Sequence, residues 1–275
     1  MKRKEGKKNQ SDKIPASRKK RDKKEQRSVI QISEFKRYKF AAERERPPIK
    51  PLNARQADYL SALERSAQLI VTGPAGTGKT WIAACHAADL FRKGKINKII
   101  LTRPTVPCGR SLGFFPGSLE EKFAPWATPI VDAFKERMGA AAYEIALKNG
   151  DIEMVPFEVM RGRSWKNAFI ILDEAQNTSI SEIKMFLTRI GEDTQTVING
   201  DIRQCDLDEQ SGLGKIINMI KQQSLPVPVI EFGIEDIVRS GLCAMWVKAF
   251  DRLEQPNGKM VFDEMTTRIE AAFRA

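Results

Sequence analysis

The residues best suited to chemistry form a glycine-rich segment that fits the pattern G-x-x-x-x-G-K-[ST]. In such a loop, backbone N–H groups and the N-terminus of a helix surround a phosphate, because unpaired amides need an anionic partner. The lysine reaches the β- and γ-phosphates, and the final hydroxyl ligates Mg²⁺. A glycine-rich turn that binds no nucleotide is the alternative. We predict a nucleotide and magnesium site made by Gly73, Pro74, Ala75, Gly76, Thr77, Gly78, Lys79 and Thr80.

Two adjacent carboxylates, Asp173 and Glu174, follow the apolar run at 168–172. A buried strand that ends there places both carboxylates at the carboxyl edge of a sheet, beside the phosphate loop. We predict that Asp173 holds Mg²⁺ through water and that Glu174 orients and deprotonates the attacking water. A glutamate at the second position favours hydrolysis over transfer to another acceptor. The alternative is a solvated turn.

Two glutamines are further candidates. Gln204 follows a predicted strand that ends at Gly200-Asp201, where a neutral polar side chain can contact the γ-phosphate and register its loss. An ordinary polar turn is the alternative. Gln56 lies in a helix predicted over 52–63, with Asn53 as its N-cap. Its closeness to the first strand makes Gln56 a candidate for an adenine contact, although a surface glutamine fits the spacing equally well.

The elements that must position these residues alternate between apolar, β-branched runs and amphipathic runs. This alternation predicts an α/β fold with a mostly parallel sheet and helices on both faces. The segment 236–240 is predicted to open a helix that continues to residue 250, and 259–275 is predicted to form one more helix. A long ordered loop is expected at 106–117. Strands are predicted at 67–72, 98–103, 152–156, 168–172, 194–200 and 227–232.

The positive charge of the chain is concentrated at its N-terminal end. The first 50 residues carry 19 Lys and Arg against 7 Asp and Glu, whereas the remaining 225 carry 27 against 28. Residues 1–48 are poor in apolar side chains and rich in like charges, so we predict a basic disordered tail there and a folded domain over 49–275. Phosphates of a nucleic acid are the partner that such a tail favours, and a solubilising tail is the alternative.

Other classes of protein fit the composition poorly. No apolar run approaches the about 18 residues of a membrane span, and no apolar segment follows the basic start, so we expect no membrane partner, no secretory signal and a cytoplasmic location. The widely spaced cysteines and the single histidine do not form a metal site, and reduced, packed thiols are expected. These residues are Cys85, Cys108, Cys205, Cys243 and His86.

The motifs together resemble those of the PhoH-like family of P-loop ATPases. The matching stretches are 73–80, Arg103-Pro104 with the 112–117 loop, 173–177, 200–207 and 236–239. The resemblance covers about residues 50–252 and implies a RecA-like P-loop NTPase core, ATP as the nucleotide, and RNA in preference to DNA as a partner. It also implies an adenine contact by Gln56 and a γ-phosphate contact by Gln204. In the family, the loop after Arg-Pro commonly starts with acidic or alanine-rich sequence. This chain departs from that pattern, because its loop starts with Thr105-Val-Pro-Cys-Gly109.

A single RecA-like lobe lacks the second lobe that lends an arginine to the transferred phosphate in helicases. A neighbouring subunit of a homo-oligomeric ring could supply it, with Arg239 as the first candidate and Arg103 or Arg203 as the next. A salt bridge with Asp236 is the alternative role for Arg239. We therefore predict an ATPase coupled to nucleic-acid binding or remodelling. The alternatives are a nucleotide-gated binding module with negligible turnover and, less compatible with Glu174 and Gln204, a small-molecule kinase.

Overall fold

The computed structural model of the chain describes residues 46–104, 119–160, 162–204, 211–239 and 241–254. The chain divides into two units, Met1–Glu45 and Arg46–Ala275, and the fold described here belongs to the second. Most of the predicted basic tail, the predicted loop at 106–117 and the predicted helix at 259–275 lie outside the described residues, as do Cys108 and Cys205. Those predictions therefore remain predictions.

A six-stranded sheet with the order β3-β2-β4-β5-β1-β6 forms the centre of the described unit. Every strand pair is parallel, so the carboxyl ends of all the strands lie at one edge. β5 lies between β4 and β1, although it follows both in the sequence. The strands are β1 (Gln68–Thr72), β2 (Lys98–Arg103), β3 (Ile152–Pro156), β4 (Ala168–Leu172), β5 (Gln195–Gly200) and β6 (Val229–Glu231).

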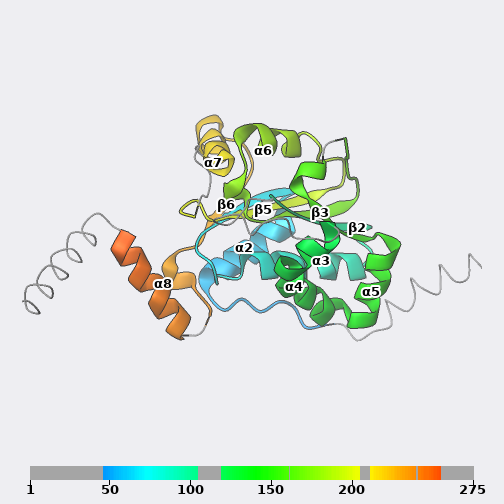
Figure 1. The fold of residues 1–275 in the computed structure, drawn as a ribbon, viewed down its shortest axis with the longest axis horizontal. Coiled ribbons are helices and arrows are strands. Elements are labelled where there is room, and N and C mark those ends of the chain that lie inside the picture. The colour runs from blue at the N-terminus through cyan, green and yellow to red at the C-terminus, as the bar shows by residue number, and fades with distance from the viewer. Residues whose placement is uncertain (1–45, 105–118, 161, 205–210, 240, 255–275) are drawn as a thin grey trace, which may run out of the picture. The chain divides into compact units, whose positions relative to one another are not determined.

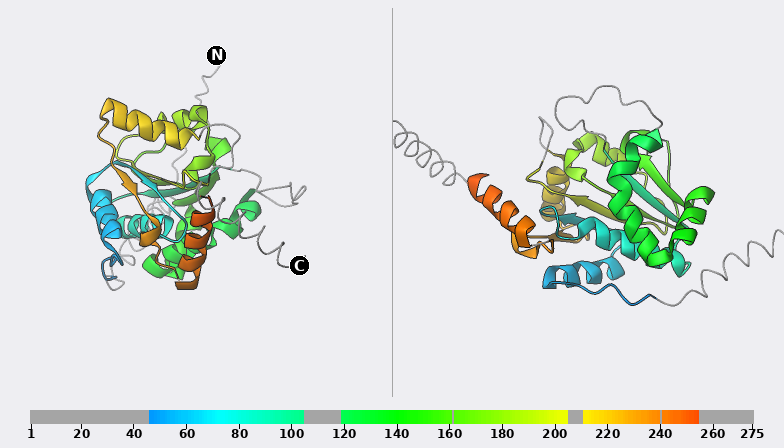
Figure 2. Two further views of the ribbon diagram at one scale, coloured as in Figure 1. Left: turned by 90° about the vertical axis from the view of Figure 1, so that its left-hand side faces the viewer. Right: turned by 60° about the horizontal axis from the view of Figure 1, so that its bottom comes forward.

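Helices cover both faces of this sheet. The helices α6 and α7 lie on one face, and α2, α3, α4 and α5 lie on the other (Figures 1 and 2). The predicted α/β, RecA-like fold class is thereby confirmed. The helices are α2 (Ala54–Arg65), α3 (Lys79–Arg92), α4 (Leu119–Met138), α5 (Ala140–Asn149), α6 (Ile180–Leu187), α7 (Gly212–Gln223) and α8 (Gly241–Glu254), with 3₁₀ turns η1 (Phe157–Met160), η2 (Ala175–Asn177) and η3 (Ile234–Asp236).

The strands are apolar runs because the sheet is covered on both sides. All five residues of β4 are buried, as expected for a central strand between two helix layers. The core on the α6 and α7 side includes Phe157 and Phe186, whose ring centroids lie 5.8 Å apart. This packing holds the carboxyl ends of β4 and β5 in place. Among the described helices, none is both long and apolar enough to cross a membrane.

Several element boundaries differ from the sequence-based expectation, and the largest shift is at α8. The helix predicted to open at Asp236, α8, begins at Gly241 instead. The reason is that η3 and the residues after it dock on the phosphate loop, where the Val238 N–H donates to the Gly76 carbonyl at 3.0 Å. At the other end, the Pro47 carbonyl accepts a hydrogen bond of 2.9 Å from Arg137. The chain is therefore anchored to the folded unit before residue 49.

Candidate nucleotide-binding site

The phosphate loop runs from β1 to α3 in a conformation that only glycine adopts easily. The φ angles of Gly73 and Gly78 are 133° and 91°, in the region where a Cβ atom is strained. A Cβ atom on Gly73 would also lie 2.4 Å from the Phe232 carbonyl oxygen. Gly78 is the N-cap of α3 and makes no side-chain cap. The strand, loop and helix occur in the predicted order, and the first N–H groups of α3 are left for an anion.

Hydrogen bonds within the loop surround Lys79. The Thr77 hydroxyl donates to the Pro74 carbonyl at 3.1 Å, so this buried side chain closes the loop. The Lys79 ammonium donates to the carbonyls of Gly73 and Pro74, at 2.5 and 2.8 Å. Burial lowers the pKa of Lys79, and nearby carboxylates oppose that shift. The ammonium rests on backbone oxygens that a phosphate could replace as its partner.

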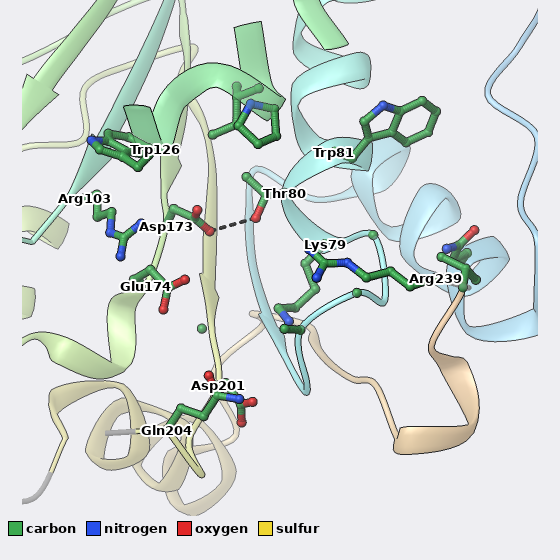
Figure 3. Close-up of a pocket in the computed structure, with 18 of the residues that line it drawn as sticks. Lys79, Thr80, Trp81, Arg103, Trp126, Asp173, Glu174, Asp201, Gln204 and Arg239 are labelled. Atoms are coloured by element: carbon green, nitrogen blue, oxygen red, sulfur yellow. Dashed lines mark hydrogen bonds between the residues drawn. The ribbon is translucent and has the colours of Figure 1, made fainter. Parts of the chain in front are cut away.

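Asp173 and Thr80 meet as the two motifs predict. The Thr80 hydroxyl donates to the Asp173 carboxylate at 2.8 Å (Figure 3). Burial raises the pKa of Asp173 above its ordinary value, and the hydrogen bond from Thr80 opposes that shift. Mg²⁺ prefers oxygen ligands and binds through one or two protein groups plus substrate phosphates. This pair fits that requirement, and the described residues contain no cluster of three or more His, Cys, Asp or Glu that could hold a metal alone.

Glu174 has a left-handed backbone, with φ of 53°, which is costly for a non-glycine residue and is often found at functional sites. Its carboxylate accepts a hydrogen bond of 2.5 Å from the Gln176 amide, and the Gln176 oxygen accepts one of 3.0 Å from the Asp201 N–H. Buried Gln176 therefore links the end of β4 to the end of β5. Sequence reasoning assigned Gln176 no role, although it lies inside the matched stretch 173–177.

Gln56 is built into the wall of the loop. Its amide nitrogen donates to the Thr77 carbonyl at 2.9 Å, and its amide oxygen accepts from the Leu52 N–H at 2.9 Å. Asn53 caps α2 through the Gln56 N–H at 2.8 Å, as predicted. Both ends of the Gln56 amide thus have partners within the chain, and its adenine contact stays a prediction.

Gln204 lies in the turn after β5 and lines the same cavity as the phosphate loop. Its N–H donates to the Asp201 carbonyl at 3.0 Å, and the Arg203 N–H donates to the Asp201 carboxylate at 3.1 Å. The exposed Gln204 side chain therefore follows a hydrogen-bonded turn directly after β5.

Arg239 lies against the phosphate loop of its own chain. A Cβ atom on Gly76 would lie 2.9 Å from the Arg239 side chain. The Asp236 carboxylate accepts from the Gly233 N–H at 2.9 Å, and no ion pair between Asp236 and Arg239 occurs among the described residues. Figure 3 shows the guanidinium directed along the loop toward Lys79. The finger role of Arg239 toward a neighbouring subunit stays a prediction.

Arg103, one of the two reserve candidates, ends β2. Its guanidinium carbon lies 5.6 Å from the centroid of the Trp126 ring, at a distance typical of a cation–π contact. Arg103 also favours the ionised form of Asp173. The indole thus holds a cation near the predicted metal ligand.

One cavity of about 700 Å³ is lined by most of the predicted site residues, namely Gln56, Ala75, Gly76, Gly78, Lys79, Thr80, Asp173, Glu174, Gln204 and Arg239. It brings together the carboxyl ends of β1, β2, β4 and β5, the first turn of α3 and the segment after η3. A glycine loop at a helix N-terminus, with a carboxylate from a neighbouring strand beside its last hydroxyl, defines a P-loop nucleotide-binding fold.

Comparison of the sequence with known protein families agrees with the P-loop class and identifies one family within it. Residues 48–251 match the family described as PhoH-like protein. The chain is 40% identical over 239 residues to Protein PhoH of Escherichia coli (strain K12), covering 85% of this chain and 67% of that protein. It is 43% identical over 199 residues to a PhoH-like protein of Bacillus subtilis (strain 168), covering 72% of this chain and 62% of that protein. The chain therefore belongs to the PhoH-like family.

Solved structures of other proteins resemble this chain weakly. A large terminase from a thermophilic bacteriophage has a TM-score of 0.44 and 9% identity, covering 75% of this chain and 51% of that one. The DUF1998 helicase MrfA bound to DNA has a TM-score of 0.42 and 11% identity, covering 72% of this chain and 29% of that one.

Proposed function

We propose that this chain is a Mg²⁺-dependent ATPase of the cytoplasm that couples ATP hydrolysis to the binding or remodelling of nucleic acid, RNA in particular. The observation that carries the proposal is the convergence of Lys79, the Thr80–Asp173 pair and Glu174 in one cavity. These groups come from separate parts of the chain. Asp173 would serve Mg²⁺ in binding as well as in catalysis, whereas binding without hydrolysis would not need Glu174.

Each side chain has a distinct part in the proposed reaction. Lys79 would leave the loop carbonyls and neutralise the β- and γ-phosphates, and Gln204 would contact the γ-phosphate. Thr80 and, through water, Asp173 would hold Mg²⁺, which when bound neutralises charge that develops on the phosphates. Glu174 would accept a proton from the attacking water, with its carboxylate held by Gln176. Arg239 would add positive charge along the phosphates.

A nucleotide-gated binding module with negligible turnover is the second candidate. It is favoured by one observation: both Lys79 and Arg239 contact their own phosphate loop. Arg239 would therefore have to leave its own loop to reach a neighbouring subunit, and Arg103 and Arg203 stay the reserve candidates for that role. The ATPase needs a homo-oligomeric ring for rapid turnover, and the gated module does not.

Phosphate release from Mg·ATP distinguishes these two functions. It is measured alone, with single-stranded RNA and with single-stranded DNA, over a series of protein concentrations. We expect turnover to rise more than linearly with protein concentration, because subunits share a site, and to be stimulated by RNA. ATP binding with phosphate release at background under every condition would favour the gated module.

The proposed contact between the basic tail and nucleic acid is tested separately. Binding of the full chain and of a chain lacking residues 1–46 to single-stranded RNA is compared over a range of salt concentrations, because this deletion keeps the contact between Pro47 and Arg137. Because Lys and Arg release counterions from phosphates, the deletion should weaken binding and flatten its dependence on salt. An unchanged slope would contradict the role of the tail.

A further inference from the structure

Asn199 is a buried polar residue that the proposed chemistry does not use. It lies near the carboxyl end of β5, paired in register with Val71 of β1. Because β5 is placed between β4 and β1, its end lies between the strand that leads to Asp173 and the strand that leads to the phosphate loop. Asn199 is completely buried, and its amide nitrogen lies 3.5 Å from the Thr80 hydroxyl oxygen.

The hydrogen bonds of Thr80 determine which way the Asn199 amide must face. A hydroxyl has one proton and two lone pairs, and the proton of Thr80 is donated to Asp173. Only a donor can then approach the Thr80 oxygen, so the amide nitrogen of Asn199 faces it and occupies one lone pair. The second lone pair remains available to a metal. The 3.5 Å distance is long for this bond, as is common before a ligand binds.

The other end of the amide has no partner in the described part of the chain. The Asn199 Oδ1 atom is buried and makes no hydrogen bond to any described residue. A buried acceptor without a partner destabilises a fold, and an apolar side chain of the same shape can replace it without loss. Packing therefore provides no reason for an amide at this position, whereas the Thr80 hydroxyl does.

We propose that Asn199 is a positioning residue for the magnesium site, and this inference rests on the proposed nucleotide site. By donating to the Thr80 hydroxyl, it orients the proton of that group toward Asp173 and leaves one lone pair for Mg²⁺. Groups that orient metal ligands in this way commonly alter metal affinity when they are removed. Asn199 would not touch the nucleotide, so it would act only through Thr80.

The test compares nucleotide affinity with and without magnesium in the full chain. Asn199→Leu keeps the branched shape but removes the donor. Binding of a fluorescent, non-hydrolysable ATP analogue is titrated in EDTA and in a series of Mg²⁺ concentrations. We expect the Mg²⁺ concentration for half-maximal effect to rise on the order of 10-fold, with affinity in EDTA unchanged. The thermal midpoint without nucleotide should be unchanged or higher, because an orphan acceptor is removed.

Thr196→Val is the matched control. Thr196 lies on the same strand, is fully buried, and its hydroxyl oxygen also has no partner among the described residues. It stands three positions before Asn199, toward the start of β5, and should leave the Mg²⁺ dependence as it is in the unsubstituted chain. Asn199→Ala is the second variant if the leucine prevents folding. An equal shift in the valine control would overturn the positioning role.

A double substitution tests whether Asn199 acts through Thr80. Thr80→Val with Asn199→Leu should lose no more Mg²⁺ dependence than Thr80→Val alone, because the two residues form one unit. Additive losses would overturn the inference. So would an unchanged Mg²⁺ dependence in Asn199→Leu, or an equal loss in EDTA. If the unsubstituted chain binds no nucleotide under any condition, the proposed function fails, and this inference fails with it.

Discussion

Polar groups at the carboxyl edge of the sheet are arranged differently from those around α3, α4 and β3, which we call the α3–α4 region. In the α3–α4 region, charged side chains form ion pairs with one another. Arg137 pairs with Asp89, and Lys98 and Arg163 both pair with Glu153, at 2.6 and 3.0 Å. These networks join elements that are distant in sequence. They leave each of these carboxylates with a cation and each of these cations with an acceptor.

At the carboxyl edge, the same kinds of group are left incompletely matched. Lys79 rests on backbone carbonyls, Glu174 has a strained backbone, and the Asn199 oxygen has no described partner. Such features lower stability and are kept where a ligand completes them. Substitutions at the edge should therefore affect binding and turnover more than folding, and substitutions in the α3–α4 region should do the opposite.

The largest expected effect is at the edge. Glu174→Gln should reduce phosphate release by about 10²–10⁴-fold, the contribution of a general base, while the affinity for ATP stays within a few-fold of the unsubstituted chain. The thermal midpoint should not fall, because the amide can still accept from Gln176. Single-turnover phosphate release and equilibrium ATP binding measure the two quantities. Loss of ATP binding together with turnover would make Glu174 a structural residue.

In the α3–α4 region, the corresponding substitution should lower the stability of the fold. Among the described residues, Arg137→Leu leaves Asp89 with Arg92 as its one cation, whose nearest nitrogen is 4.0 Å away, and it removes the partner of the Pro47 carbonyl. We expect the free energy of unfolding to fall by about 3 kcal/mol, as for breaking a largely buried pair. Urea denaturation checks this value. ATP affinity per folded molecule should be unchanged, and a loss of affinity at full folding would contradict the separation of the two regions.

Substitution of Gln176 should affect both stability and turnover, because its side chain contacts a backbone N–H and a predicted catalytic carboxylate. Gln176→Leu leaves the buried Asp201 N–H without its acceptor, which should lower the free energy of unfolding by about 1–3 kcal/mol. It also releases the Glu174 carboxylate, so phosphate release should fall at unchanged ATP affinity. Urea denaturation and a turnover assay below the unfolding transition separate the two effects. An effect on stability alone would remove Gln176 from the proposed mechanism.

The smallest expected effect concerns His86, which lies in α3 with its ring centroid 5.8 Å from that of Phe169. Burial lowers the pKa of His86 from 6.5, so the folded state favours the neutral ring. Its contribution to stability is therefore present above about pH 6.5 and is lost as the pH falls below it, because the unfolded chain takes up the proton first. His86→Phe should reduce the loss of thermal midpoint between about pH 7 and pH 5. An identical pH profile would contradict a lowered pKa of His86 in the folded state.

Much of the site could be predicted from local sequence. The phosphate loop, the carboxylates after β4 and the Asn53 cap depend on neighbours a few residues away, and the structure has them as expected. Gly73 and Gly78 need a positive φ, which glycine alone adopts readily. The wrong start of α8 has a tertiary cause, since the Val238 N–H bonds to Gly76 of the phosphate loop instead of continuing a helix.

By itself, the sequence determined the motifs, the strands and the class of fold, because apolar periodicity and glycine geometry act over short distances. Only the tertiary structure decided which strands are neighbours. The insertion of β5 between β4 and β1 brings Asn199 to Thr80 and Gln176 to Asp201, from positions up to 119 residues apart. Strand order depends on long-range pairing and on how two helix layers pack, and no local pattern in the chain records it.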